Sequence, residues 1–177
     1  MIVNKKIVLT TPICYSIDRF GFDAPDFSSW EKIINSGEGG NLLAKVLSSA
    51  VLGIDAYRVE VEIDITSGLP TFTTVGLPET SVKESKERVK SAISNSGYRF
   101  PDDRITVNLA PADIKKEGTG FDLPIALGIL AATGIIPQKI ISQYLILGEL
   151  SLDGRVKPVR GSLPMALAAK DAGYKAI

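Results

Sequence analysis

The chain has 177 residues, of which 45% are hydrophobic and 23% are charged, and its formal net charge is zero. This length and composition fit one globular domain with a short additional segment. A neutral charge balance gives no general attraction to nucleic acid or to anionic membranes, so any such surface has to be local. The sequence has no histidine, which excludes histidine-based acid–base catalysis, histidine-activated nucleophiles and histidine metal ligands.

Cysteine content and hydropathy indicate the cellular compartment. Cys14 is the only cysteine, so no internal disulfide can form, and a reducing environment is the natural interpretation. No apolar run reaches the roughly 18 residues that a membrane span needs, and no signal-peptide pattern is present at the N-terminus. We therefore expect a cytoplasmic protein with no membrane partner.

The first strands are predicted in the region where the pattern becomes regular, from Leu42 onward. Residues 44–51 predict a strand, and residues 71–75 predict another. Between them, residues 59–66 alternate Val and Ile with charged residues, and this period of two indicates a strand with one solvated face.

A helix is predicted over residues 81–94, because Ser81 and Glu84 form a capping-box pattern and an Asn-Ser-Gly run follows the helix. Residues 104–109 alternate again and predict a fourth strand. Residues 110–120 predict a loop.

The next helix is predicted over residues 123–133, where almost every residue is apolar, so that the helix is buried on most sides. We expect Asp122 to cap it. Residues 144–147 and 155–159 predict two strands joined as a hairpin by an Asp-Gly turn.

A last helix is predicted over residues 163–171 with Ser162 as its cap, and a further strand begins at residue 174. A core strand interrupted at the end of the chain indicates a fragment. Hairpins mixed with helical crossovers favour a two-layer α/β domain, with the helices on one face of a mixed sheet.

Motifs for nucleotide chemistry are missing from the sequence. A phosphate loop needs a Gly-Lys pair, and neither this dipeptide nor a Walker-B-like Asp-Glu pair occurs, so this chain alone should not hydrolyse ATP. No Gly-x-Ser-x-Gly motif is present. Gly118 and Gly120 predict a tight turn before the buried helix rather than a dinucleotide site. We expect no cofactor and no metal ion in this chain.

An acidic run lies on one face of the second strand, at Glu60, Glu62 and Asp64. Such a row could bind a cation or carry out acid–base chemistry. The solvated face of an antiparallel strand is the interpretation that we favour.

Two small basic clusters could contact a phosphate backbone. The alternative is that they are solvated loops. The cluster of residues 155–160 is a better candidate than the cluster of residues 115–116, because only Asp153 lies near it in sequence. The candidate contacts to DNA or to a partner are Lys115, Lys116, Arg155, Lys157 and Arg160.

Eight sequence blocks, in the expected order, resemble a known family. They are residues 43–56, 75–79, 82–93, 95–97, 108–113, 116–118, 121–128 and 148–154. Over about residues 42–177 the chain is similar to the N-terminal domain of the Mg-chelatase-like AAA+ ATPases, the ComM/YifB type.

This resemblance implies the ribosomal S5 domain 2-like fold, which is shared with the Lon protease domain. It implies a parent protein with a following AAA+ module that uses ATP and Mg²⁺, assembles into hexamers and, in ComM-type members, acts as a DNA helicase that promotes branch migration during natural transformation. For this chain it implies a non-catalytic scaffold that self-associates and could contact DNA. The alternatives are a pure oligomerisation module without a DNA role, and a residual Lon-like protease.

The resemblance to Lon also allows a test for a protease dyad. Lon-type proteases use a Ser nucleophile before a buried helix and a Lys that takes its proton. Here the nucleophile position falls at Gly120, and the Lys position falls within residues 161–165, which contain no Lys. Thr119 is the only nearby hydroxyl. The chain is therefore expected not to be a protease.

Residues 1–41 lie outside the resemblance. Leu42 stands where family members usually have the initiating Met, and a TTG codon there would be read internally as Leu. Residues 37–40, Gly-Glu-Gly-Gly, are the peptide that a purine-rich ribosome-binding site would encode if it were translated in this frame. We interpret residues 1–41 as translated leader or a fused upstream piece, the alternative being a genuine extension that packs on the domain. Residues 42–177 are interpreted as the domain, truncated before the AAA+ module.

Overall fold

The structure is a computed structural model that describes residues 42–176. Our interpretation of residues 1–41 lies outside these residues. Within them, a mixed six-stranded sheet has the order β3-β4-β2-β1-β5-β8. Its strands are β1 (Leu42–Leu52), β2 (Asp55–Thr66), β3 (Thr71–Val75), β4 (Arg104–Ala110), β5 (Tyr144–Leu145) and β8 (Lys175–Ala176). Strand β2 pairs antiparallel with β1 and β4, whereas β3–β4, β1–β5 and β5–β8 are parallel pairs.

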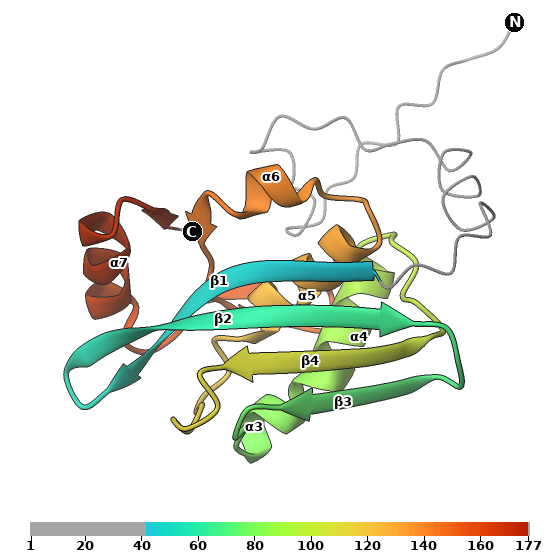
Figure 1. Cartoon of the computed structure of the whole chain (residues 1–177), viewed down its shortest axis with the longest axis horizontal. Helices are drawn as coiled ribbons and strands as arrows, with labels where there is room; N and C mark the ends of the chain where they lie inside the picture. The colour runs from blue at the N-terminus through green and yellow to red at the C-terminus, as the bar shows by residue number, and fades with distance from the viewer. Residues whose placement is uncertain (1–41, 177) are drawn as a thin grey trace, which may run out of the picture.

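Two longer helices form the second layer. Helix α5 (Asp122–Ala132) packs on β1 and β2, and α4 (Ser85–Asn95) packs against α5, so both lie behind the sheet in Figure 1. The short helices α3 (Thr80–Lys83) and α6 (Gln138–Ile141) and the last helix, α7 (Ser162–Asp171), complete the helical elements among the described residues. The predicted two-layer α/β architecture is confirmed.

The core lies between α5 and the inner face of the sheet. The Val and Ile residues that alternate along β2 are buried, as the period of two predicts. Every residue of α5 except Ala131 is buried. Gly128 allows the close approach of this helix, because a Cβ atom there would lie 2.6 Å from Cγ1 of Ile63. None of the helices in residues 42–176 is long and apolar enough to cross a membrane.

The predicted hairpin between residues 144–147 and 155–159 is wrong. Strand β5 runs parallel to β1, and the Ile146 amide donates to the Leu47 carbonyl, so this segment belongs to the main sheet. The hairpin instead joins β6 (Glu149–Leu150) to β7 (Val156–Lys157) as a separate two-stranded sheet. The two segments adjoin in sequence, and the period of two alone does not show where the first ends.

The predicted side-chain caps are also wrong. Ser81 lies inside α3, and its hydroxyl donates to the Gly118 carbonyl at 3.4 Å, so no capping box forms. The predicted single helix over residues 81–94 is divided at Glu84 into α3 and α4. Helix α7 is preceded by Gly161, with a φ of 75°, rather than by a capping serine.

Candidate functional site

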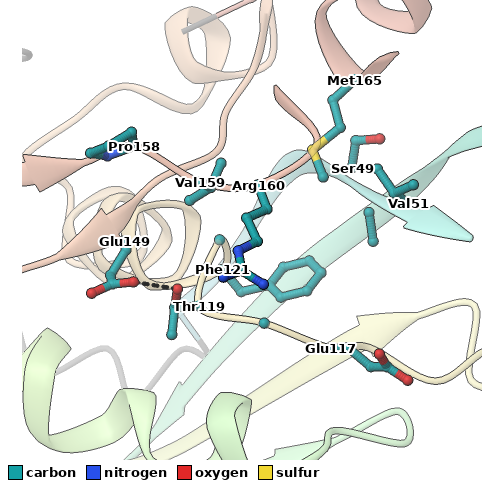
Figure 2. A pocket seen from close by; sticks show the side chains of 13 residues that line it. Ser49, Val51, Glu117, Thr119, Phe121, Glu149, Pro158, Val159, Arg160 and Met165 are labelled. Atoms are coloured by element: carbon teal, nitrogen blue, oxygen red, sulfur yellow. Dashed lines mark hydrogen bonds between the residues drawn. The ribbon is translucent and has the colours of Figure 1, made fainter. Parts of the chain in front are cut away.

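A cavity of about 540 Å³ opens in front of the N-terminus of α5 (Figure 2). Its walls come from β1, the loop of residues 117–121, β6, the segment of residues 158–160 and α7. Gly120 lies in the cavity wall. This residue stands at the position where the resemblance to Lon places a nucleophile. The volume falls within the range of about 300–1,000 Å³ that is typical of ligand sites.

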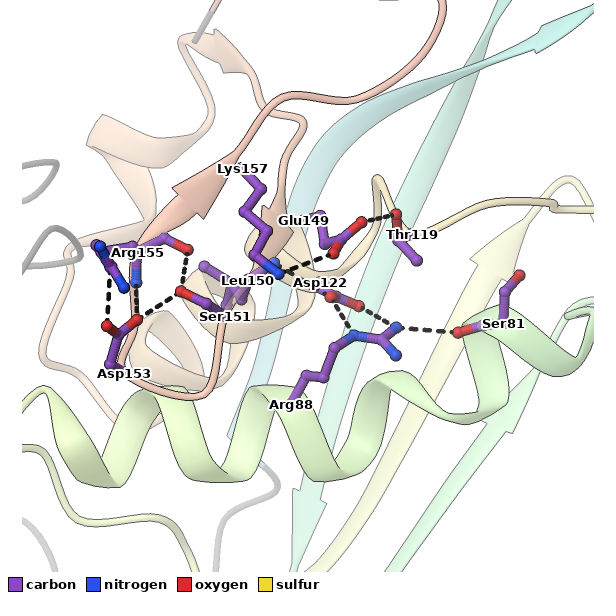
Figure 3. Close-up of polar contacts among 10 residues, drawn as sticks. All are labelled: Ser81, Arg88, Thr119, Asp122, Glu149, Leu150, Ser151, Asp153, Arg155 and Lys157. Carbon is purple, nitrogen blue, oxygen red and sulfur yellow. Dashed lines mark hydrogen bonds and ion pairs between the residues drawn. The ribbon is translucent and has the colours of Figure 1, made fainter.

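The only hydroxyl side chain in the cavity loop faces a carboxylate rather than an amine. Thr119 Oγ1 donates to Glu149 Oε2 at 2.5 Å, and Lys157 Nζ lies 3.5 Å from the other oxygen, Oε1 (Figure 3). The Thr119 hydrogen bond, aided by Lys157, holds the pKa of Glu149 below its ordinary value. A carboxylate with a lowered pKa is a poor general base, so this arrangement does not activate the threonine.

We expect Thr119→Val to raise the pKa of Glu149 towards its ordinary value of 4.5, because the principal stabiliser of the carboxylate is lost. Carboxyl ¹³C NMR titration of Glu149 measures this change. The pKa of the folded wild type is lowered, so the stabilisation is present above pH 4.5 and is lost as the pH falls through the folded-state pKa. The stability difference between the two proteins should therefore be largest at neutral pH.

Thr133→Val is the matched control for this prediction. The Thr133 hydroxyl donates to backbone carbonyls at the end of α5, so its removal should leave the titration of Glu149 unchanged. An unchanged Glu149 titration in the Thr119 variant would contradict the assignment.

An ion pair between a buried carboxylate and a partly exposed guanidinium lies beside this cavity, at the first turn of α5 (Figure 3). Arg88 from α4 holds Asp122 with two hydrogen bonds, Nε–Oδ2 at 2.6 Å and Nη2–Oδ1 at 3.0 Å. The same guanidinium donates to the Ser81 carbonyl, and Asp122 accepts from the Leu150 amide. The prediction that Asp122 caps α5 is therefore wrong, because the helix is preceded by Phe121 and has no side-chain cap. Burial raises the pKa of Asp122, and the Arg88 hydrogen bonds oppose this effect.

Lys116 is removed from the candidate contact residues by its burial. Its side chain is 0% exposed, and its Nζ donates to the carbonyl of Pro111. Burial also lowers the pKa of its ammonium group. The backbone of Lys116 exchanges hydrogen bonds with Leu77 and Glu79, which seats this residue against the β3–α3 connection. A side chain in this position cannot reach a phosphate backbone.

The other four candidate cations are exposed but mostly paired. Lys115 lies 3.5 Å from Glu79, Arg155 lies 2.8 Å from Asp153, and Lys157 contacts Glu149. Arg160 extends into the cavity in Figure 2 and has no ion-pair partner within residues 42–176. The structure thus brings Arg160 to the cavity and places Lys157 against Glu149 in the cavity wall, positions that sequence reasoning did not predict.

The acidic row on β2 belongs to a solvated sheet face, as we favoured. Lys45 on the neighbouring strand lies 3.0 Å from Glu60 and 2.7 Å from Glu62. Asn108 donates to Glu62 from the other side, and the Lys45 hydrogen bond lowers the pKa of Glu62. Within the described part of the chain, no three His, Cys, Asp or Glu side chains come together as a metal-ion group.

Comparisons with known proteins agree with this fold. Residues 61–177 match the model of the family described as subunit ChlI of Mg-chelatase. The chain belongs to this Mg-chelatase-like family, and within it to the ComM/YifB type.

The relatives identify the type. The chain is 47% identical to YifB of Escherichia coli over 135 residues, which are 76% of this chain and 27% of that protein. It is 48% identical to the competence protein ComM of Haemophilus influenzae over 128 residues, 72% of this chain and 25% of that protein. Lon protease 2 of Bacillus subtilis is 30% identical over 132 residues, 71% of this chain and 23% of that protein, which fits the Lon-like fold. The chain thus spans about a quarter of the length of these relatives.

Proposed function

We propose that this chain is a non-catalytic scaffold domain of a ComM-type AAA+ ATPase. The observation that carries the proposal is the cavity in front of α5, where Gly120 has no side chain and Thr119 is bonded to the carboxylate of Glu149. A Ser–Lys dyad needs a hydroxyl facing an amine, and Glu149 stands between Thr119 and Lys157. In this proposal the domain contributes to assembly, and the ATP- and Mg²⁺-dependent step belongs to an AAA+ module of a longer parent.

The DNA part of the proposal rests on the exposed cations. The relative ComM is named a competence protein. A parent that acts as a branch-migration helicase, as the family resemblance implies, would bring this domain near DNA. Of the four exposed candidates, Lys115, Arg155 and Lys157 have acidic neighbours that reduce their attraction for phosphate. Arg160 is therefore the contact that we expect to matter most.

DNA binding should be weak and should fade as salt rises, because only local phosphate contacts are available. Fluorescence anisotropy of a labelled duplex over a salt series measures it. Arg160→Ala should reduce the slope of log K against log salt by about 1. Arg58→Ala, which removes an exposed arginine on the sheet face, is the control and should have no effect. Tight binding that is insensitive to salt would contradict the proposal, as would turnover of a peptide or nucleotide by the purified chain.

A pure oligomerisation module is the second candidate function. The observations that favour it are the zero net charge and the pairing of three exposed cations with carboxylates. Light scattering on the same samples separates the two functions. Self-association without any detectable DNA binding would support the oligomerisation module.

A further inference from the structure

An uncharged and unburied segment surrounds β3. Residues 69–78 contain ten consecutive residues without a charge, in a chain that is 23% charged, and none of them is buried. The two leucines of the segment are strongly exposed, Leu69 at 81% and Leu77 at 53%. Exposed apolar surface is typical of protein–protein contact sites, so the exposed leucines and the missing charges indicate a surface that a partner covers.

Strand β3 is an open edge of the main sheet. Within residues 42–176 it pairs only with β4, through five consecutive residues without a bulge, and it is the outermost strand in Figure 1. Monomeric proteins protect such edges with lysines, prolines, bulges or covering segments. The five residues of β3, Thr-Phe-Thr-Thr-Val, include neither a lysine nor a proline, and the prolines of the segment, Pro70 and Pro78, lie outside the strand.

We propose that β3 pairs antiparallel with β3 of a second copy of this chain, across a two-fold axis at Thr73, so that two sheets become continuous. In such a pairing Thr73 meets its own copy and Thr71 lies opposite Val75. Leu69 and Leu77 lie four residues before and after Thr73 in the sequence, so one exposed leucine lies beyond each end of the strand.

The choice of a second copy over another polypeptide rests on this symmetry and on charge. At a two-fold interface a residue on the axis meets itself, so a charged residue there would repel its own copy. An uncharged strand with threonine at its centre avoids that repulsion. The contact does not depend on the proposed scaffold function, because a ring of subunits uses head-to-tail surfaces and not a two-fold edge. One strand pair buries little area, so we expect a weak association.

Sedimentation velocity of the full chain over a concentration series tests the proposal. The wild type should shift reversibly from the monomer mass to twice that mass. Thr73→Lys should weaken this dimer by at least about tenfold, because two ammonium groups meet on the axis. Thr106→Lys is the matched control, since Thr106 is the β4 residue registered with Thr73, one strand inward from the edge. The control should dimerise like the wild type.

Charge reversal provides the rescue. Thr73→Glu alone should weaken the dimer to a similar degree, whereas an equal mixture of the Lys and Glu variants should recover it. Hydrogen exchange of the wild type gives a measurement that needs no variant, because the β3 amides should gain protection as concentration rises.

Several results would overturn the pairing. The first is a wild type that stays monomeric, which would be the result if residues 1–41 or another protein occupied the edge. The second is a dimer or hexamer that Thr73→Lys leaves intact. Equal loss in both lysine variants, aggregation without a defined dimer, or unchanged β3 protection would also overturn it. A hexamer that survives Thr73→Lys would leave the scaffold function standing.

Discussion

Arg88→Met should lower the free energy of unfolding by about 3–5 kcal/mol, because it leaves a buried carboxylate without its counter-charge. The side chain of Asp122 is 1% exposed, and two of its three hydrogen bonds come from Arg88. Urea denaturation followed by circular dichroism measures the loss. The deficit should shrink in acid, because protonation of Asp122 removes the uncompensated charge.

Arg58→Met is the control for this prediction. Arg58 also faces a carboxylate, Glu60 at 3.5 Å, but its side chain is 61% exposed, so the loss should stay below about 1 kcal/mol. Combining Arg88→Met with Asp122→Leu should recover part of the stability, since no charge is then left buried. The Leu150 amide still loses its acceptor, which limits the recovery. Equal losses for the Arg88 and Arg58 variants would contradict the structural importance of the ion pair.

The parts of the fold that short-range periodicity encodes were predicted correctly. Strand β2 alternates because one face packs on α5, and α5 is apolar because nearly all of it is buried. Each pattern is complete within about a dozen residues, so a single sequence shows it. The loop before α5 was also located correctly, and it lines the cavity.

Contacts between distant residues could not be derived in the same way. Arg88 and Asp122 are 34 residues apart, and local rules assigned Asp122 to a helix cap. The partner of β7 was misassigned because β5 and β6 adjoin in sequence but belong to different sheets. In each case a tertiary contact replaced the local partner that sequence spacing favours.

The candidate site shows the same limit for charge. Lys115 and Lys116 are neighbours in a loop, yet Lys115 is exposed beside Glu79 and Lys116 is fully buried. The difference arises because the Lys116 backbone is bonded to Leu77 and Glu79, which carries its side chain inward. A lysine in a polar loop gives no sequence signal of burial, so only the structure could remove it from the set.

Gly76→Ala should have the second large effect, a loss of about 2–5 kcal/mol of unfolding free energy. Gly76 follows β3 with a φ of 94°, and a Cβ atom there would lie 2.1 Å from the Leu109 carbonyl oxygen. The positive φ costs a non-glycine residue about 1–2 kcal/mol, and forcing an added group into a packed site costs about 1–3 kcal/mol more. Because the obstructing atom belongs to the backbone of β4, no side-chain rotation can relieve the contact.

Gly53→Ala separates the two costs. Gly53 also has a positive φ, 66°, but nothing lies within 4 Å of the added Cβ in the β1–β2 turn. This variant should therefore lose only the conformational part, about 1–2 kcal/mol, in the same urea titration. The difference between the two variants measures how tightly the chain after β3 is packed on β4. If Gly76→Ala were no less stable than Gly53→Ala, the connection would have to shift freely, and β3 could not be held in the fixed position that pairing along its open edge requires.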